Sequence, residues 1–257
     1  MSMENQTLQE YNLCKLNHKR EHINLIKLEN VVNIRDLGGY KTDGGKFTKH
    51  NVFYRSGNTD KSSKNDMKKL IEVYNEKTVI DLRNSDEIKQ SPDKFAEISE
   101  VNYINIPIEY SECLEEFKST DRRLAILYDY ILKEKKQVLK AVFDAIANAN
   151  EGSLLFHCTL GRDRTAIIAM LLLGLAGVSR NDIIQNYTIS YDLIKNLDII
   201  KRDLILYGKR KTITLPEYIE STMDFIENNY DTFENYLLDC NVSKSNLIKI
   251  KNRFIQQ

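Results

Sequence analysis

Residues 152–178 read GSLLFHCTLGRDRTAIIAMLLLGLAGV, and this stretch decides the fold. A short apolar run ends at Cys158, a longer one begins at Thr165, and the charged triplet Arg-Asp-Arg at 162–164 lies between them. The first run has the length of a buried strand and the second that of a buried helix. The charges therefore occupy the turn between a strand and a helix, at the carboxyl end of a sheet, where α/β proteins place ligand sites.

The rest of the chain supplies further strands and helices. Runs rich in β-branched and aromatic residues predict strands at 23–28, 51–55, 77–82, 101–106 and 153–158. Apolar residues recur at near-helical spacing from Leu124 to Ala149. Helix starts are indicated by Ser179 with Asp182, and by Thr214 with Glu217 around Pro216. We predict an α/β fold with a central mixed sheet flanked by helices.

Composition favours one neutral globular domain. The chain has 257 residues, 42% of them hydrophobic, and no low-complexity linker divides it, so we predict a single domain over 1–257 with a loosely packed extension at 1–21. Lys plus Arg and Asp plus Glu both number 37, which leaves no net field for nucleic acid or an anionic membrane. The basic run at 209–211 is interpreted as a solvated face.

The cysteines and the apolar runs bear on location. Cysteines at 14, 113, 158 and 240 form no CxxC pair, which favours reduced thiols. The polar N-terminus lacks a secretory apolar core, and the longest apolar stretch has 13 residues where a membrane span needs roughly 20. We predict a cytoplasmic protein without a stable membrane anchor. Export by a route without a standard signal, and the oligomeric state, stay open.

The turn has the features of a phosphate-binding loop. Five residues separate Cys158 from Arg164: Thr159, Leu160, Gly161, Arg162 and Asp163. Their amides, at the N-terminus of a helix, can point inward and donate to phosphate oxygens. Gly161 permits a backbone conformation that a side chain resists. Arg164 can hold two oxygens with its planar guanidinium.

Cys158 at the base of this loop is the candidate nucleophile. The positive field that attracts a phosphate also lowers the pKa of the thiol, from about 8.5 in a free cysteine toward the values found at helix N-termini. A thiolate that faces a bound phosphate is a nucleophile in place. The alternative, a buried structural cysteine, does not explain Gly161 and Arg164 at these offsets.

These residues resemble a known signature. His157-Cys158-TLGRD-Arg164-Thr165 is similar to the H-C-x5-R-T motif of the cysteine-dependent protein tyrosine phosphatase superfamily. Four more segments resemble bacterial tyrosine phosphatases of the lipid-phosphatase-like subgroup: NIRDLGGY at 33–40, FYRSG at 53–57, VIDLRNSDE at 79–87 and LPEYIESTMDFIENNY at 215–230. The resemblance spans roughly residues 22–250. It implies a tyrosine-phosphatase-like fold and activity on phosphotyrosine, often also on phosphoserine, phosphothreonine and phosphoinositides.

The resemblance also implies roles for single residues. His157 resembles a buried residue that supports the loop, an interpretation we prefer to that of a catalytic base. Thr165 can hydrogen-bond the sulfur and help it leave when water attacks. The subgroup usually has Gly-Lys-Asp-Arg-Thr-Gly where this chain has Gly-Arg-Asp-Arg-Thr-Ala at 161–166. The lysine is associated with a second phosphate, and Arg162 keeps its charge. We expect the alanine to be harmless inside a helix.

Two aspartates are candidates for the general acid that protonates the leaving group. Asp163 lies inside the loop directly before Arg164, and similar placement in myotubularin-like phosphatases is taken to supply the proton. Asp81 ends the predicted strand VIDL and can face the same pocket from a neighbouring strand. We favour Asp163, because its proximity follows from the motif. The alternative interpretation of Asp81 is a structural carboxylate paired with Arg83 or Arg55.

The sequence leaves the substrate and the turnover open. The expected partner is a phosphorylated protein or a phosphoinositide; an inositol-polyphosphate phosphatase and a phospho-ligand-binding module without turnover are the alternatives. A helical lid over 109–133, with Tyr110, Phe117, Tyr128 and Tyr130, would decide which substrates enter. We predict no cofactor and no metal, because Cys14, His18 and His22 share helical spacing but lack a fourth ligand.

Overall fold

The computed structural model of the chain describes residues 23–113 and 123–257. The predicted extension at 1–21, the residues considered for zinc, and Phe117 of the predicted lid lie outside these ranges.

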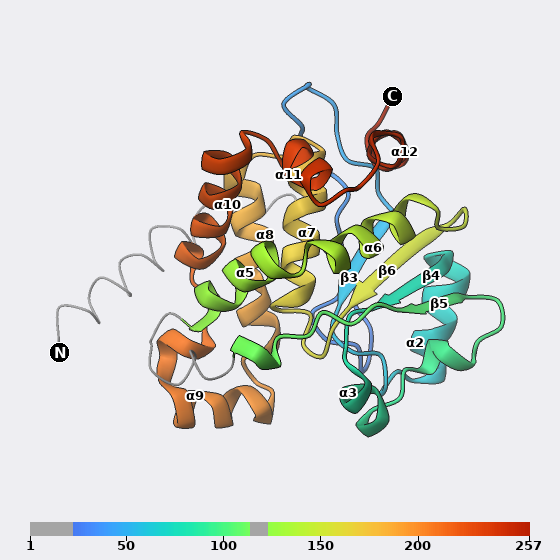
Figure 1. The fold of residues 1–257 in the computed structure, drawn as a ribbon. Helices are drawn as coiled ribbons and strands as arrows, with labels where there is room; N and C mark the ends of the chain where they lie inside the picture. Colours follow the sequence, from blue (N-terminus) through green and yellow to red (C-terminus); the bar gives the residue numbers. More distant parts are fainter. Residues whose placement is uncertain (1–22, 114–122) are drawn as a thin grey trace.

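A mixed sheet lies at the centre of the described residues (Figure 1). Its strands are β1 (Asn24–Leu25), β2 (Arg35–Asp36), β3 (Phe53–Ser56), β4 (Glu76–Asp81), β5 (Asn102–Asn105) and β6 (Ser153–His157). They are ordered β1-β2-β3-β6-β4-β5. The β1–β2 and β2–β3 pairs are antiparallel, and the other pairs are parallel. The predicted mixed sheet is confirmed.

Four of the five strand predictions are confirmed. Four of the predicted runs form β3, β4, β5 and β6 within two residues of the expected bounds. The run at 23–28 is ordered as a strand only at β1, and β2 was not predicted. The reason is that β2 consists of one arginine and one aspartate, which carry no signal for a strand.

The sheet separates two hydrophobic cores, because alternate side chains of a strand point to opposite faces. In β6, Leu154 and Phe156 join the larger core, whereas Leu155 joins the smaller one. Neighbouring β4 divides in the same way, with Ile80 in the larger core and Val79 in the smaller. A strand buried on both faces explains why this segment reads as a continuous apolar run.

Most helices cover the face with the larger core (Figure 1). They are α5 (Arg123–Glu134), α6 (Lys136–Ala147), α7 (Arg164–Leu175), α8 (Arg180–Ile194), α10 (Pro216–Tyr230), α11 (Phe233–Asp239) and α12 (Lys244–Phe254). A further helix, α9 (Asp198–Thr212), follows α8. The helical period from Leu124 to Ala149 belongs to two helices that separate at Lys135.

One of the two predicted helix starts needs correction. Ser179 caps α8, and its hydroxyl accepts from the amide of Asp182 as predicted. The helix α10 does begin at Pro216, but Leu215 precedes it without a side-chain cap. Thr214 was the wrong capping residue, because its hydroxyl donates instead to the carbonyl of Thr188 on α8.

Shorter elements cover the other face. The helix α2 (Lys64–Lys68) continues as a π-helical turn, η1 (Lys69–Val73), and η2 (Lys94–Glu97) is a 3₁₀ turn. The helix α3 (Ser85–Gln90) follows β4, and the turn η3 (Ser111–Cys113) follows β5. Leu70 and Phe95 pack against Val79 and Leu155 of the sheet in the smaller core.

The register brings the carboxyl ends of the parallel strands together. His157 at the end of β6 pairs with Ser56 of β3 and with Asp81 of β4, and Asp81 pairs in turn with Asn105 of β5. The loops that follow these strands therefore meet at one edge of the sheet, where the sequence predicted the site.

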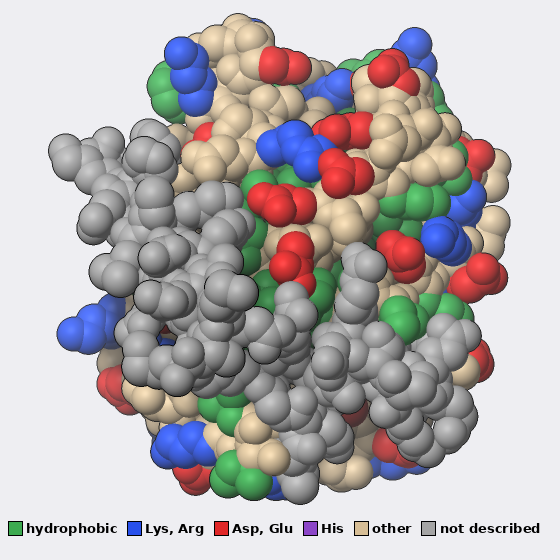
Figure 2. All heavy atoms as spheres, turned by 90° about the vertical axis from the view of Figure 1, so that its left-hand side faces the viewer, with side chains coloured by type: hydrophobic (Ala, Val, Ile, Leu, Met, Phe, Trp, Pro, Cys, Tyr) green, Lys and Arg blue, Asp and Glu red, His purple; other side chains and the backbone are tan. Residues whose placement is uncertain are grey.

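The described surface carries charges of both signs. On the face drawn in Figure 2, basic and acidic side chains are interspersed around the residues drawn in grey. Among the described helices, none is long and apolar enough to span a bilayer.

Candidate active site

The segment between β6 and α7 forms a loop whose carbonyl groups are held by the neighbouring segments. The amide of Asn58 donates to the carbonyl of Thr159 at 3.0 Å. The side-chain amide of Asn33 donates to the carbonyls of Leu160 and Gly161, both at 2.9 Å. Because these carbonyl groups are bound to the neighbouring segments, the opposite side of the loop is left for its amide groups, as an anion-binding loop requires.

Gly161 is required at its position by both conformation and space. Its φ of +64° lies in the left-handed region, which side chains other than glycine rarely adopt. A Cβ at this position would also lie 2.3 Å from the carbonyl oxygen of Ser56. The loop therefore packs directly on the end of β3, and a glycine is needed at this position.

Cys158 lies at the start of this loop and is only 3% exposed. Burial raises the pKa of its thiol, but the charge of Arg164 and hydrogen bonding from Thr165 outweigh burial, and the pKa is lowered. The Thr165 hydroxyl is itself buried and has no other partner among the described residues. The candidate nucleophile and its predicted hydrogen-bonding neighbour are thus together.

Arg164, in the first turn of α7, is fixed by an acid that sequence analysis did not select. Its two terminal nitrogens donate to the two carboxylate oxygens of Glu87 at 2.6 and 2.7 Å. Partial burial raises the pKa of Glu87, but the hydrogen bonds and charge of Arg164 lower it to about 2. Glu87 also accepts a hydrogen bond from the hydroxyl of Thr159. The guanidinium is therefore oriented before any substrate is bound.

Asp163 is surrounded by donors. It accepts from the hydroxyl of Tyr128 at 2.9 Å, and the Nε of Arg162 lies 3.2 and 3.0 Å from its two oxygens. Arg162 is itself buried and forms an ion pair with Asp163. Tyr128 is in turn hydrogen-bonded to Tyr187 at 2.8 Å.

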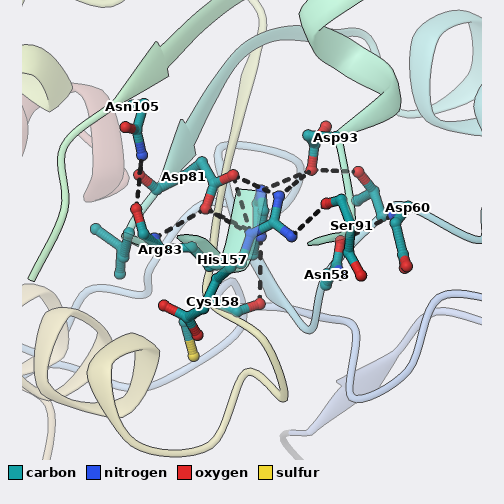
Figure 3. Close-up of polar contacts among 12 residues, drawn as sticks. Asn58, Asp60, Asp81, Arg83, Ser91, Asp93, Asn105, His157 and Cys158 are labelled. Carbon is teal, nitrogen blue, oxygen red and sulfur yellow. Dashed lines mark hydrogen bonds and ion pairs between the residues drawn. The ribbon is translucent and has the colours of Figure 1, made fainter. Parts of the chain in front are cut away.

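His157 belongs to a buried ion cluster behind the loop (Figure 3). Its Nε2 lies 3.1 Å from a carboxylate oxygen of Asp93, and its Nδ1 lies 3.3 Å from the carbonyl of Cys158. Burial lowers the pKa of His157, but Asp81 and Asp93 outweigh burial and raise it. The Cys158 sulfur lies on the side away from this cluster. The position of His157 matches that of a loop-supporting residue.

Asp81 lies in the same cluster, with both oxygens engaged by Arg83. The Nε of Arg83 lies 3.0 and 3.1 Å from them, one terminal nitrogen lies 2.7 Å from Oδ2, and the hydroxyl of Tyr103 donates to the same oxygen. This arrangement matches the alternative interpretation, a structural carboxylate paired with Arg83. Asp163 is the candidate acid that the structure places in the loop itself.

The cluster also offers three metal-ligand atoms. One atom each from Asp81, Asp93 and His157 lie within 4.8 Å of one another. The guanidinium of Arg83 already contacts both carboxylates, at 2.7 Å from Asp81 and 3.6 Å from Asp93. A resident positive charge among these acids does not fit a metal cation in the same place.

The predicted lid is only partly described. Tyr110 stacks under the guanidinium of Arg164, with 5.5 Å between the guanidinium carbon and the ring centre. Tyr130 donates to Glu112 near the surface. Tyr128 is fully buried in the larger core, so its prediction as a lid residue was wrong: its side of α5 packs inward, and only its hydroxyl reaches the loop.

The residues that sequence reasoning did not assign come from the motifs that carried the resemblance. Asn33 lies in NIRDLGGY, Arg55 in FYRSG, and Glu87 at the end of VIDLRNSDE. Glu87 could have been found from the sequence, because it is an acid that follows a predicted strand, and an arginine in an anion-binding loop needs a fixed partner. No comparable signal marked Asn33, whose role depends on a contact 127 positions away.

This arrangement defines an α/β protein with a cysteine and an arginine at the two ends of an anion-binding loop. A family model described as the tyrosine phosphatase family matches residues 26–256. The chain therefore belongs to the tyrosine phosphatase family, and the predicted resemblance is confirmed.

Individual relatives agree with this family. A tyrosine-protein phosphatase of Nostoc commune is 43% identical over 114 residues, which cover 43% of this chain and 39% of the Nostoc protein. A Cupriavidus necator protein whose name places it among tyrosine-protein phosphatases is 27% identical over 231 residues, 83% of each chain. Among solved structures, a complex of P. aeruginosa TpbA with phosphotyrosine has 13% identity and a TM-score of 0.38, covering 81% of this chain and 99% of that chain.

Proposed function

We propose that the protein hydrolyses phosphotyrosine monoesters through a cysteinyl-phosphate intermediate. The observation that carries the proposal is the loop itself. Its carbonyls are bound from behind, and Cys158, with a lowered pKa, stands at one end while the fixed guanidinium of Arg164 stands at the other. Membership in the tyrosine phosphatase family supports the choice of substrate.

In the first step, the Cys158 thiolate attacks phosphorus and the bond between phosphorus and the ester oxygen breaks. The loop amides from Thr159 to Asp163, with Arg164, stabilise the charge on the equatorial oxygens. The departing oxygen takes a proton from Asp163, which therefore has to be protonated when the ester bond breaks.

In the second step, water attacks phosphorus, the bond between sulfur and phosphorus breaks, and inorganic phosphate leaves. The proton of the attacking water passes to the carboxylate of Asp163. Cys158 departs as a thiolate, which Thr165 stabilises from the first turn of α7. The loop amides and Arg164 supply the positive charge that a metal supplies in other phosphatases, so we propose that turnover needs no metal.

One experiment separates this enzyme from a binding module without turnover. Release of phosphate from a phosphotyrosine peptide and from para-nitrophenyl phosphate is measured with chelator present, for the wild type and for Cys158→Ser. We expect turnover only in the wild type. A wild type that binds the peptide but releases no phosphate establishes the binding module.

Phosphoinositides and inositol polyphosphates are the second candidate substrates, because the loop holds a second guanidinium. Arg162 contacts Asp163, so it reaches a neighbouring phosphate only by leaving that carboxylate. A panel of phosphopeptides, phosphoinositides and inositol phosphates is compared for the wild type and Arg162→Ala. A loss of roughly ten- to hundredfold confined to multiply phosphorylated substrates supports this candidate, whereas an equal loss on all substrates assigns Arg162 to the support of Asp163.

A further inference from the structure

Two arginines of the sheet are buried without an acidic partner among the residues that the structure describes. Arg35 of β2 and Arg55 of β3 are paired in register, and they are 0% and 1% exposed. Neither forms an ion pair with any described residue, and the Nε of each has no hydrogen-bond partner in the described part of the chain. Burial of a charged group without a counterion is unfavourable. The packing of the sheet therefore does not by itself explain why two charged side chains are buried here.

The partners of the two guanidiniums differ. Arg35 donates only to neutral acceptors of the segments around it, which are the carbonyl and side-chain oxygens of Asn33, the carbonyl of Asn186 and the hydroxyl of Ser190. Arg55 donates to the side-chain oxygen of Asn186 and to the carbonyl of Gly161, both at 2.8 Å. Arg55 is thus the one of the two that contacts the phosphate-binding loop directly.

We propose that Arg55 is a positioning residue of the active site with two effects. Its guanidinium holds the Gly161 carbonyl away from the phosphate, and its charge, which no described carboxylate neutralises, stabilises the Cys158 thiolate and the bound phosphate from behind the loop. The proposal rests on the proposed role of Cys158, and it assigns a function to the FYRSG segment of β3.

The charge state of Arg55 supports this role. Burial lowers the pKa of Arg55 to about 10, and the negative charge of Cys158 acts in the opposite direction. A pKa of about 10 leaves Arg55 protonated near neutral pH. Because Arg55 is buried, its charge is screened less than a surface charge.

Several groups besides Arg55 interact electrostatically or by hydrogen bonding with the Cys158 thiol. Arg164 and Asp163 come from the loop and α7, Thr165 comes from α7, and Tyr110 lies after β5. Arg164 makes the largest favourable contribution to the lowered pKa of Cys158. We therefore expect loss of the Arg55 charge to raise the pKa of Cys158 by about one unit, the low end of the 1 to 3 units typical of a nearby opposite charge.

The test is the pH dependence of alkylation of Cys158 by iodoacetamide, which reports the thiolate without turnover. Arg55→Gln removes the charge and also the terminal nitrogen that donates to Gly161, whereas Arg55→Lys keeps the charge. We expect the midpoint of alkylation to rise by about one pH unit in Arg55→Gln and to stay near the wild-type value in Arg55→Lys. Arg253→Gln is the control, since Arg253 donates to backbone carbonyls at the opposite end of the sheet.

A second variant neutralises the charge without removing the arginine. Asn186→Asp is isosteric and places a carboxylate at the atom that accepts from Arg55. We expect this variant to fold, to keep the contact between Arg55 and Gly161, and to raise the alkylation midpoint by about one pH unit. This variant keeps the proposal testable even where Arg55→Gln does not fold.

The outcomes separate this inference from the proposed function. A raised midpoint in Asn186→Asp, with the wild-type midpoint in Arg253→Gln, supports the role of Arg55. A folded Asn186→Asp with the wild-type midpoint overturns it. Hydrolysis of para-nitrophenyl phosphate is measured on the same samples, and a wild type that is alkylated at low pH but hydrolyses nothing overturns the proposed function while the alkylation result still decides the inference.

Discussion

Arg164 and Glu87 form a two-point ion pair across the mouth of the phosphate-binding loop, with nitrogen-to-oxygen distances of 2.6 and 2.7 Å. The pair joins α7 to α3, the helices that follow the neighbouring strands β6 and β4. A guanidinium held in this way keeps its orientation when the site is empty, so binding of phosphate requires less ordering.

Loss of this ion pair should weaken catalysis without unfolding the protein. Glu87→Gln keeps an acceptor for the amide of Asn84, which Glu87 caps, but it removes the charge that fixes Arg164. We expect kcat/KM for para-nitrophenyl phosphate to fall roughly ten- to hundredfold, the size of one charge-assisted hydrogen bond. Asp86→Asn, which changes an exposed acid one position earlier, is the control. Equal kinetics in the two variants would contradict the role of Glu87.

Cys158 and Cys240 should differ in reactivity, because burial raises the pKa of Cys240 to about 11 while the pKa of Cys158 is lowered. Each pKa unit changes the thiolate fraction about tenfold. From this difference in thiolate fraction, we expect iodoacetamide at pH 7 to label Cys158 at least about tenfold faster than Cys240. Peptide mass spectrometry measures the two labelling rates. Vanadate in the loop should protect Cys158 alone. Labelling of both cysteines at one rate argues against an activated thiolate.

The part of the site closest to Cys158 could be predicted from the sequence because it is local. The strand, the loop and the helix follow one another along the chain, so the spacing of Cys158, Gly161 and Arg164 fixes their neighbourhood. The supports behind the loop could not be predicted in this way. Arg55 reaches Gly161 across 106 positions, and this contact depends on the parallel pairing of β3 with β6.

The surroundings of Asp81 and Tyr128 were also hard to predict, because they too depend on how distant parts of the fold pack. Asp81 and His157 are paired in register, but the chain turns after Asp81 so that Arg83 covers both of its oxygens. The order Asp-Leu-Arg left Arg83 and Arg55 as alternative partners of Asp81, and the fold decides between them in favour of Arg83. Tyr128 was assigned to the lid from its neighbours in sequence, whereas the packing of α5 buries it.

Glu76 should make stability depend on pH. Burial in β4 raises its pKa from 4.5 to about 8, although Ser153 and the amide of Leu155 donate to it. Glu76 is protonated in both the folded and the unfolded chain below about pH 4.5, so its full contribution to the free energy of unfolding is present there. This contribution is lost progressively as the pH rises to the folded-state pKa of about 8. The loss amounts to about 3 kcal/mol by pH 7. Glu76→Gln should remove this dependence and be the more stable protein at pH 8.

Urea unfolding at pH 5 and pH 8 measures the effect of Glu76 directly. The wild type should lose unfolding free energy between the two values, and Glu76→Gln should lose less. Glu151→Gln, at an exposed position in the turn before β6, is the control and should follow the wild type. Identical slopes in Glu76→Gln and Glu151→Gln would show that Glu76 is ionised in the folded protein at both pH values.

The surroundings of Asp163 and Asp81 lead to opposite expectations for their removal. Asp163 lies in the loop and meets Tyr128 and Arg162, whereas Asp81 is fully buried against Arg83. Asp163→Asn should slow an alkyl phosphate by about 10² to 10⁴, the usual contribution of a general acid, slow an activated aryl phosphate far less, and erase the alkaline limb of the kcat profile. Asp81→Asn should keep that limb and lose stability, since breaking a buried ion pair costs about 3 to 5 kcal/mol.

Kinetics with both leaving groups and urea unfolding are measured on each variant. A folded Asp81→Asn without the alkaline limb, beside an Asp163→Asn that retains it, would assign the proton to β4.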